Sequence, residues 1–386
     1  MSSEPNRGTS NRRHVQHQPR ERTWRRWPWR WPALAVANLI GLGALLLVIE
    51  GASRLLGHQP SVDPATGKIW TFDGTRGWIH VPGAAAPTCV GGATGPLARI
   101  NGLGLRGPEV SLSRPPRTRR VLVFGDSFVF GVGVPEEQLF SGHLERLLSH
   151  SGAVQVLNFG VAGYSTDQEY LLFRDLGVRL GPDLVILVMC DNDFLANTED
   201  FAYRRYYKPF FEEGPGGTLL LRNVPVPRLS WLQRGKLWLS QHSAMWELFR
   251  SRSSRNRLLR GSLGLFQLAV PKRSAEEPVS ITFALVSEFH SLARRIGAGF
   301  LVLNTGHRGE KTPLYHALRP KLDAAGIPYL GLEAALERAR RIDPERAWDF
   351  DDDTHWNSDA HKLAANVVYT HMRRTSLLAR LFGGRG

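Results

Sequence analysis

Cysteine is nearly absent from this chain, which limits the kinds of protein that it can be. Only Cys89 and Cys190 occur among 386 residues. Small secreted domains that depend on disulfides carry many more cysteines at regular spacings. A bridge between Cys89 and Cys190 is one alternative, but we expect two free thiols and a fold held by a hydrophobic core. The apolar content of 42% is enough for one large domain or two small ones.

Several catalytic and ligand-binding motifs are missing as well. No Gly-x-x-x-x-Gly-Lys-Ser/Thr sequence is present, which argues against a phosphate-binding P-loop. The sequence GDSFV around Ser127 lacks the closing glycine of the Gly-x-Ser-x-Gly elbow, which argues against an α/β-hydrolase. His355, Asp359 and His361 could imitate a metal site, but no further ligands cluster with them. We expect no metal and no cofactor.

Acidic residues are scarce relative to basic ones, and the net charge is +14. The excess is concentrated in residues 1–31, which hold eight arginines, two glutamates and four tryptophans. Single-stranded nucleic acid could explain basic and aromatic residues together. The segment directly precedes an apolar run, however, and a membrane interface explains both residue types better. We expect no nucleic-acid partner.

The chain has one long apolar run. Residues 32–49 are interrupted only by Asn38, and apolar residues continue to position 56. As a helix, residues 32–49 would span roughly 27 Å, close to the thickness of a bilayer core. A cleaved signal peptide and a buried core helix are the alternatives, but the run is long for a signal and lacks a clean Ala-x-Ala end. We predict a transmembrane anchor over residues 32–56.

The flanking charges predict the orientation of this anchor. Arginines upstream of a span favour the cytoplasmic side, so residues 1–31 form a basic cytoplasmic tail in this interpretation. Everything after Gly57 then lies outside the cytoplasm. We predict a single-pass protein of the inner (cytoplasmic) membrane, with its main domain in the periplasm of a bacterium.

A candidate nucleophile follows a predicted buried strand. Residues 121–124 are apolar and rich in valine, and Gly125-Asp126-Ser127 predicts a turn after them. Ser127 thus lies at the carboxyl end of a strand, where open α/β sheets bind ligands. An isolated Gly-Asp-Ser is usually an ordinary turn.

A candidate base lies near the other end of the chain. Residues 351–357 read DDDTHWN, which places Asp352 three residues before His355. A nucleophilic serine needs a base, and the imidazole needs a carboxylate to fix its tautomer. This short segment offers both, although an acidic segment with one histidine is more often merely solvated.

These segments resemble the four conserved blocks of the SGNH hydrolases, also called the GDSL esterase/lipase family. The first block resembles residues 125–127 and the last resembles residues 352–355; residues 158–163 (NFGVAG) and 190–193 (CDND) resemble the two between them. Cys190 stands where the third block has glycine, which puts the local backbone in question. The resemblance covers about residues 101–372. It implies a Ser127, His355 and Asp352 triad, with an oxyanion hole from the N–H groups of Ser127 and Gly163 and the side chain of Asn192.

Strands and helices alternate from residue 120 onward. Apolar runs at 121–124, 154–159, 184–189, 300–304 and 329–332 are separated by segments with helical periodicity. Such alternation predicts a parallel sheet with helices on both faces. The predicted fold class is α/β, a three-layer α/β/α flavodoxin-like SGNH hydrolase fold preceded by one N-terminal transmembrane helix.

The domain boundaries follow from this pattern. We predict an extracytoplasmic spacer with short strands over residues 57–118, the hydrolase domain over 119–376 and a C-terminal tail over 377–386. Residues 101–107 (NGLGLRG) resemble a segment that packs onto the catalytic domain in membrane-tethered members of the family. Residues 195–277 form an aromatic and arginine-rich insertion. It could be a lid or sugar-binding wall beside the site, or a small helical subdomain that buries its own rings.

The expected function is hydrolysis of an ester, most simply an O-acetyl group on an extracytoplasmic carbohydrate. Two alternatives remain open. The chain could be an O-acyltransferase acting on a cell-envelope polysaccharide, served by a separate membrane partner that donates the acyl group. It could also be a non-catalytic binding protein on the same scaffold.

Overall fold

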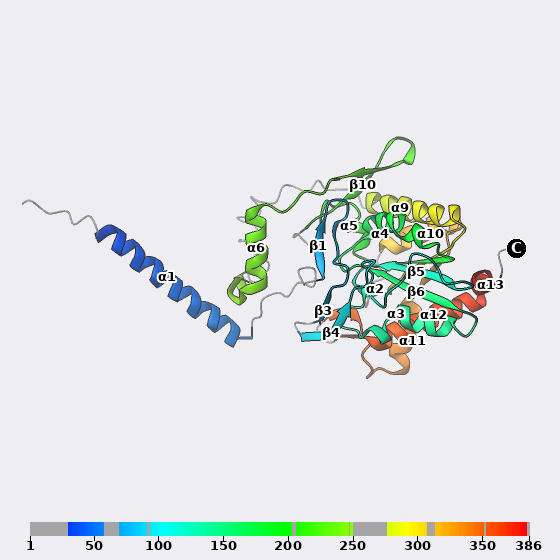
Figure 1. The fold of residues 1–386 in the computed structure, drawn as a ribbon, viewed down its shortest axis with the longest axis horizontal. Coiled ribbons are helices and arrows are strands. Elements are labelled where there is room, and N and C mark those ends of the chain that lie inside the picture. The colour runs from blue at the N-terminus through cyan, green and yellow to red at the C-terminus, as the bar shows by residue number, and fades with distance from the viewer. Residues whose placement is uncertain are drawn as a thin grey trace, which may run out of the picture.

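The structure is a computed structural model of the chain (Figure 1). It describes residues 30–57, 69–90, 93–202, 206–246, 248–249, 276–306, 313–350 and 353–383. Asp351 and Asp352 lie outside the described residues, as does the arginine-rich stretch from 250 to 260.

A five-stranded parallel sheet forms the centre of the molecule. Its strand order is β13-β12-β7-β5-β6. The strands are β5 (Arg119–Gly125), β6 (Val154–Gly160), β7 (Leu184–Met189), β12 (Gly299–Asn304) and β13 (Tyr329–Gly331). Each coincides with a predicted apolar run. The predicted parallel α/β sheet is confirmed.

Helices cover both faces of this sheet because successive strand residues point to opposite sides. Along β5, Leu122 and Phe124 pack into one core, whereas Val121 and Val123 pack into the other. The first core is covered by α4 (Thr166–Asp175), α9 (Glu276–Arg295) and α10 (Pro313–Ala324). The second is covered by α3 (Phe140–Leu148), α11 (Glu333–Ile342), α12 (Ser358–Arg374) and α13 (Leu377–Phe382). The result is the predicted three-layer α/β/α fold.

The strand order creates a switch point between β5 and β7. From β5 the chain moves outward to β6 and then returns past β5 to β7. In doubly wound sheets, the crevice at such a reversal, outside the carboxyl ends of the strands, is where ligands bind. The segments that follow β5, β6 and β7 therefore meet at one edge.

The N-terminal helix α1 (Arg30–Leu55) extends away from the sheet domain (Figure 1). Its side chains are largely exposed, including Leu39, Ile40 and Leu47. Within the described part of the chain, it is the one helix long and apolar enough to cross a membrane, and a signal sequence would pass the same test. Length and composition thus agree with the predicted apolar segment.

The segment between α1 and the sheet domain contains two hairpins. One pairs β1 (Trp70–Asp73) with β2 (Gly77–His80), and the other pairs β3 (Ala85–Val90) with β4 (Ala93–Arg99). Arg106 then forms an isolated antiparallel bridge with Asn158 on β6. The NGLGLRG segment therefore packs against the edge strand of the main sheet.

The described part of the insertion contains more β-structure than either interpretation of it assumed. Short hairpins pair β8 (Phe201–Ala202) with β9 (Tyr206–Tyr207), and β10 (Phe210–Glu213) with β11 (Leu219–Arg222). Phe211 packs with Leu171 of α4 and Leu285 of α9. The helix α6 (Trp231–His242) lies near the C-terminal end of α1, apart from the sheet and its flanking helices (Figure 1).

The C-terminal segment differs from the tail that the sequence suggested. Residues Leu377–Phe382 form α13, and Leu381 is buried in the same core as α12. A six-residue helix has little stability alone, so packing of its apolar face explains why it forms.

Candidate active site

Ser127 is the first residue of α2 (Ser127–Phe130), a four-residue helix directly after β5. Asp126 caps this helix, and its carboxylate accepts a hydrogen bond from the Phe128 N–H at 2.9 Å. Gly131 ends the helix with a φ of 80°, in the left-handed region that favours glycine. Ser127 itself is half-buried and lies at the carboxyl edge of the sheet.

The turn is held against β6 by a close backbone approach. A Cβ added at Gly160 would lie 2.1 Å from the Phe130 nitrogen, so only glycine fits at this position. The Asn158 side chain donates a hydrogen bond to the Val129 carbonyl at 2.7 Å. The block that begins at Asn158 therefore supports the helix that carries Ser127.

His355 lies in β15 (Asp353–Trp356), which pairs with β14 (Asp349–Phe350) just before α12. Its Nε2 is 2.7 Å from the Ser127 Oγ, a hydrogen bond across 228 residues of sequence. The ring also packs on Phe128 at 5.1 Å between centroids. The predicted contact between serine and imidazole is present, whereas Asp352 lies outside the described residues.

Asn357 fixes where α12 starts after His355. Its side-chain oxygen accepts hydrogen bonds from the N–H groups of Asp359 and Ala360, at 3.0 and 3.1 Å. Asn357 is therefore the N-cap of α12.

Gly163 and Asn192 follow β6 and β7, at the same sheet edge as Ser127. Gly163 has a φ of 82° in a loop whose Val161 N–H donates to the Gly125 carbonyl at 3.0 Å. Asn192 is exposed, and its side chain hydrogen-bonds to the carboxyl of Asp126. The cap of the helix that begins at Ser127 thus also contacts the predicted oxyanion donor.

Cys190, the departure from the family pattern, is accommodated without strain. It is 6% exposed, and it is not among the described residues with positive φ. Burial holds the pKa of its thiol well above the ordinary value, so the thiol stays neutral. Its N–H donates to the Asp193 carboxyl at 3.1 Å.

Lys208 links the two segments that follow the predicted oxyanion donors Gly163 and Asn192. This residue of the insertion is fully buried and forms an ion pair with Asp167 at the start of α4. Its ammonium also donates to the carbonyls of Ala196, at 2.9 Å, and Glu199. Since α4 follows the Gly163 loop and α5 (Asp193–Ala196) follows Asn192, one side chain joins both segments.

Two further carboxyls lie in this buried region. Burial, together with neighbouring acids, raises the pKa of Glu169 and of Asp193 well above the ordinary values. Burial also raises the pKa of Asp126, although His355 and the hydrogen bonds to Asp126 oppose the rise. Lys208 offsets the charge of Asp167, whereas burial beside neighbouring acids favours the neutral form of Glu169 and Asp193.

Arg106 supports the C-terminal end of α2. It is 2% exposed and donates to the carbonyls of Phe130, Gly131 and Val134 at 2.5 to 2.6 Å. Phe130 ends α2, Gly131 is its C-cap and Val134 follows, so one guanidinium binds the segment in which the chain leaves the helix. Burial lowers the pKa of Arg106 to about 10, so the guanidinium remains charged near neutral pH.

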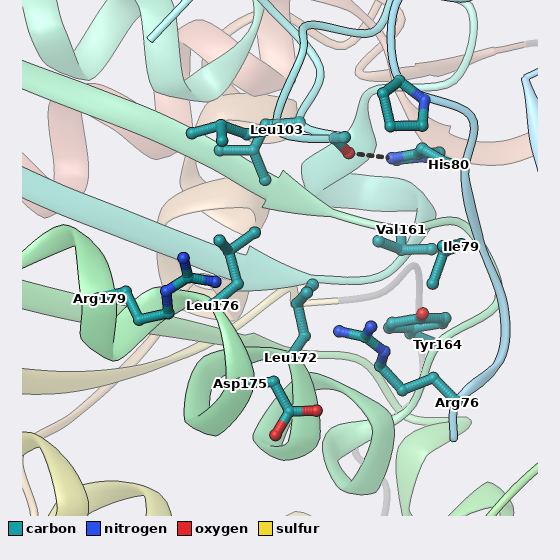
Figure 2. A pocket seen from close by; sticks show the side chains of 13 residues that line it. Arg76, Ile79, His80, Leu103, Val161, Tyr164, Leu172, Asp175, Leu176 and Arg179 are labelled. Carbon is teal, nitrogen blue, oxygen red and sulfur yellow. Dashed lines mark hydrogen bonds between the residues drawn. The ribbon is translucent and has the colours of Figure 1, made fainter. Parts of the chain in front are cut away.

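A separate cavity of about 350 Å³ is lined by residues that flank Gly163 in the sequence, among them Val161 and Tyr164 of Figure 2. Arg76, Leu172 and Arg179 also line it. The Tyr164 hydroxyl donates to the Trp78 carbonyl, and burial raises the pKa of that hydroxyl. Ser127, His355 and Asn192 do not line this cavity, so it is distinct from the Ser127 site.

Arg106 and Lys208 differ in how far they could be predicted from the sequence. Arg106 falls in the NGLGLRG segment, whose family resemblance marked it as packing onto the domain. Lys208 is a single lysine among aromatic residues and carried no signal. Its partner Asp167 is 41 positions away, and only the fold brings the two together.

The fold and the site define a class of protein. A doubly wound parallel sheet carries a serine at the switch point, hydrogen-bonded to a histidine that precedes the last large helix. The sequence model of the GDSL-like lipase/acylhydrolase family matches residues 123–363, and the chain belongs to this family.

Solved structures with similar folds include several esterases. A two-domain esterase active on acetylated mannans shares 11% identity, with a TM-score of 0.39 over 67% of this chain and 49% of its own. A lipolytic protein of the G-D-S-L family from Veillonella parvula shares 12% identity, with a TM-score of 0.38 over 67% of this chain and 100% of its own. An acetyl-xylooligosaccharide esterase from Geobacillus shares 11%, with a TM-score of 0.36 over 69% of this chain and 95% of its own.

The chain spans about half the length of the first of these structures. A comparison with curated protein sequences finds no match.

Proposed function

We propose that this protein is a membrane-anchored serine esterase that removes acyl groups, specifically O-acetyl groups, from an extracytoplasmic carbohydrate. The observation that carries the proposal is the 2.7 Å hydrogen bond between the Ser127 Oγ and the His355 Nε2 at the switch point of the sheet. A serine and an imidazole in this geometry can form an activated nucleophile.

The proposed chemistry proceeds in two acyl-transfer steps. His355 takes the Ser127 proton as the hydroxyl attacks the ester carbonyl, and a tetrahedral oxyanion forms. His355 then gives that proton to the leaving alcohol, which leaves an acyl-serine. Water, deprotonated by His355, attacks this ester and releases the carboxylic acid. Asp352 holds the imidazole in position and stabilises its charged form.

The oxyanion is stabilised by donors from three different segments in this proposal. They are the N–H groups of Ser127 and Gly163 and the side-chain amide of Asn192. Several features support a rigid donor set, which is what electrostatic stabilisation of a transition state requires. Asn192 is hydrogen-bonded to Asp126, and Lys208 links α4 to α5.

Hydrolysis is favoured over transfer to a sugar by the surroundings of Ser127. Ser127 and His355 are half-buried and Asn192 is exposed, so water can reach an acyl group on Ser127. Acyl transfer to a sugar requires water to be excluded. The acetylated carbohydrate rests on family membership and on the proposed extracytoplasmic location, since esters of this kind occur on envelope glycans.

The anchor is the second part of the proposal. Helix α1 has the length and hydropathy of a single span, and the arginines before it favour a cytoplasmic N-terminus. The sheet domain would then act on the outer side of the inner membrane.

The test is mass spectrometry of acetylated oligosaccharides incubated with the detergent-solubilised full chain. Loss of acetyl groups with wild type, and none with Ser127→Ala, is the expected result. A second reaction contains an unacetylated oligosaccharide and an activated acetyl ester. Acetylation of that sugar with little release of acetate would replace the esterase with a transferase, and no turnover of any ester would favour a binding protein.

A further inference from the structure

Helix α6 has an unusual surface for a helix of a soluble domain. Trp231, Leu232 and Trp238 are 73%, 56% and 58% exposed. Isolated exposed apolar residues are normal, but large ones grouped on one helix mark an interaction surface. Trp238 stacks on His242 of the same helix, yet all three side chains stay more than half exposed among the described residues.

The charged residues of α6 are all basic. The helix reads WLQRGKLWLSQH, with Arg234 and Lys236 but no acidic residue. Both cations are exposed between the two tryptophans. Tryptophan together with lysine or arginine on one helix is typical of a surface that lies in the headgroup region of a bilayer.

The C-terminal end of α6 is attached to the last turns of α1. Glu50 accepts hydrogen bonds from the Ser243 hydroxyl at 2.8 Å and from the N–H groups of Ala244 and Met245 at 2.9 and 3.0 Å. Arg54 donates to the His242 carbonyl at 3.0 Å and pairs with Glu50 at 2.8 Å. Figure 1 shows α6 crossing near this end of α1.

We propose that α6 is an interfacial helix that lies on the outer leaflet and inserts Trp231, Leu232 and Trp238 among the lipid headgroups. The proposal rests on the proposed membrane span of α1. If residues 32–49 fill the hydrocarbon core, Glu50 and Arg54 lie at its outer boundary. The hydrogen bonds from Glu50 and Arg54 then hold α6 at that same depth.

Charge complementarity favours anionic lipid as the binding partner of α6. Arg234 and Lys236 can bind lipid phosphates, and no carboxylate on α6 opposes them. A sugar-binding role for the two tryptophans would require them to face the Ser127 site. The attachment to α1 holds them beside the membrane anchor instead. The insertion thereby has two roles. Its helix α6 holds the sheet domain at the membrane, and its Lys208 links α4 and α5 within that domain.

The test uses the full chain in nanodiscs of phosphatidylethanolamine and phosphatidylglycerol. A benzophenone amino acid replaces one residue at a time, and lipid adducts are identified by mass spectrometry. The three positions are Trp231 on α6, Leu47 on α1 and Ile342 on the sheet domain. They are matched in exposure, at 73%, 74% and 74%, so differences in lipid adducts report location and not accessibility.

We expect lipid adducts at positions 231 and 47 and none at 342. Adducts at 47 without adducts at 231 would leave the span intact and overturn the interfacial helix. The absence of adducts at 47 would overturn the span and, with it, this inference. Equal adducts at 231 and 342 would also overturn it, because they would show non-specific contact.

A charge variant tests the lipid class. The double substitution Arg234→Gln and Lys236→Gln should reduce the phosphatidylglycerol share of the adducts at position 231 on the order of fivefold for each removed charge. Hydrolysis of a short soluble ester should be unchanged. An unaltered phosphatidylglycerol share would contradict the proposed role of these cations.

Discussion

Asn192 is the residue at which the proposed oxyanion site can be tested most selectively. Its amide would act on the charge of the transition state and not on the neutral ester. Asn192→Ala should therefore lower kcat by roughly 10² to 10³ with little change in KM. Steady-state kinetics on a short acyl ester measures both constants.

The matched control is Asn366→Ala. The exposed Asn366 donates its amide hydrogen bond to the Lys362 carbonyl one turn earlier, on the solvent face of α12. This variant should retain full activity. Equal effects of the two substitutions would remove Asn192 from the oxyanion site.

Asp352 is predicted to orient His355, and its carboxylate can be removed with almost no change in volume. Asp352→Asn should lower kcat by roughly 10⁴, the effect of a wrongly held imidazole tautomer. Asp353→Asn should have a small effect. The reverse order of the two losses would transfer the role to Asp353.

His361 should make the stability of the domain depend on pH. It is 1% exposed and accepts a hydrogen bond from the Phe140 N–H at 3.0 Å, and burial lowers its pKa to about 3. The unfolded chain, with a histidine pKa of about 6.5, binds this proton more readily. The stabilisation from neutral His361 is therefore complete above a pH of about 6.5 and is lost as the pH falls toward about 3, on the order of 5 kcal/mol in all.

Denaturant unfolding of the detergent-solubilised protein between pH 7 and about pH 4 measures this dependence. The transition midpoint should fall with pH more steeply in wild type than in His361→Gln, which cannot gain a proton. Parallel pH profiles for the two proteins would show that His361 does not cause the loss.

At the scale of elements, Lys208 of the insertion holds α4 and α5 together. Lys208→Met removes the buried cation and leaves Asp167 without its partner. Breaking a buried ion pair on one side typically costs about 3–5 kcal/mol. The double variant Lys208→Met and Asp167→Asn should be less destabilised than the sum of the two single variants, as measured by unfolding midpoints.

The same substitution should affect catalysis through position. Because Lys208 touches neither Ser127 nor His355 among its described contacts, fluorophosphonate labelling of Lys208→Met should continue while kcat falls. A positioning role for Lys208 would be contradicted by two results together: the stability losses of the two single variants add up in the double variant, and kcat of Lys208→Met is unchanged.

The elements also show what the sequence could predict. The five sheet strands coincide with apolar runs because a strand buried on both faces needs apolar residues at every position. The hairpins of the insertion escaped prediction, since β8 and β9 are two residues each and are formed by tertiary contacts. Helix α13 was missed for the same reason, because one buried leucine leaves little periodicity to detect.

The sequence predicted the main residues of the candidate site but not the residues that support them. Ser127 and His355 could be paired from their family blocks, and the structure brings their side chains into contact, while their catalytic roles stay predictions. The supporting contacts of Lys208 and Arg106 could not be predicted. Each depends on which carbonyls and carboxylates the fold places around one long side chain, and sequence spacing carries no such information.

For the whole molecule, the membrane proposal predicts an orientation. The arginines before α1 should keep the N-terminus in the cytoplasm and export everything after Gly57. Protease added to intact spheroplasts should digest the sheet domain, as detected with an antibody against it. Full protection, or release of the domain into the soluble fraction by signal cleavage, would contradict this topology.

The central claim is that Ser127 is a nucleophile activated by His355. Its most direct test is covalent labelling of the folded full chain with a fluorophosphonate, followed by peptide mass spectrometry. The account predicts one adduct per chain, located on Ser127, and loss of labelling in both Ser127→Ala and His355→Ala. Folded wild-type protein that stays unlabelled, or a label on another serine that persists in Ser127→Ala, would contradict it.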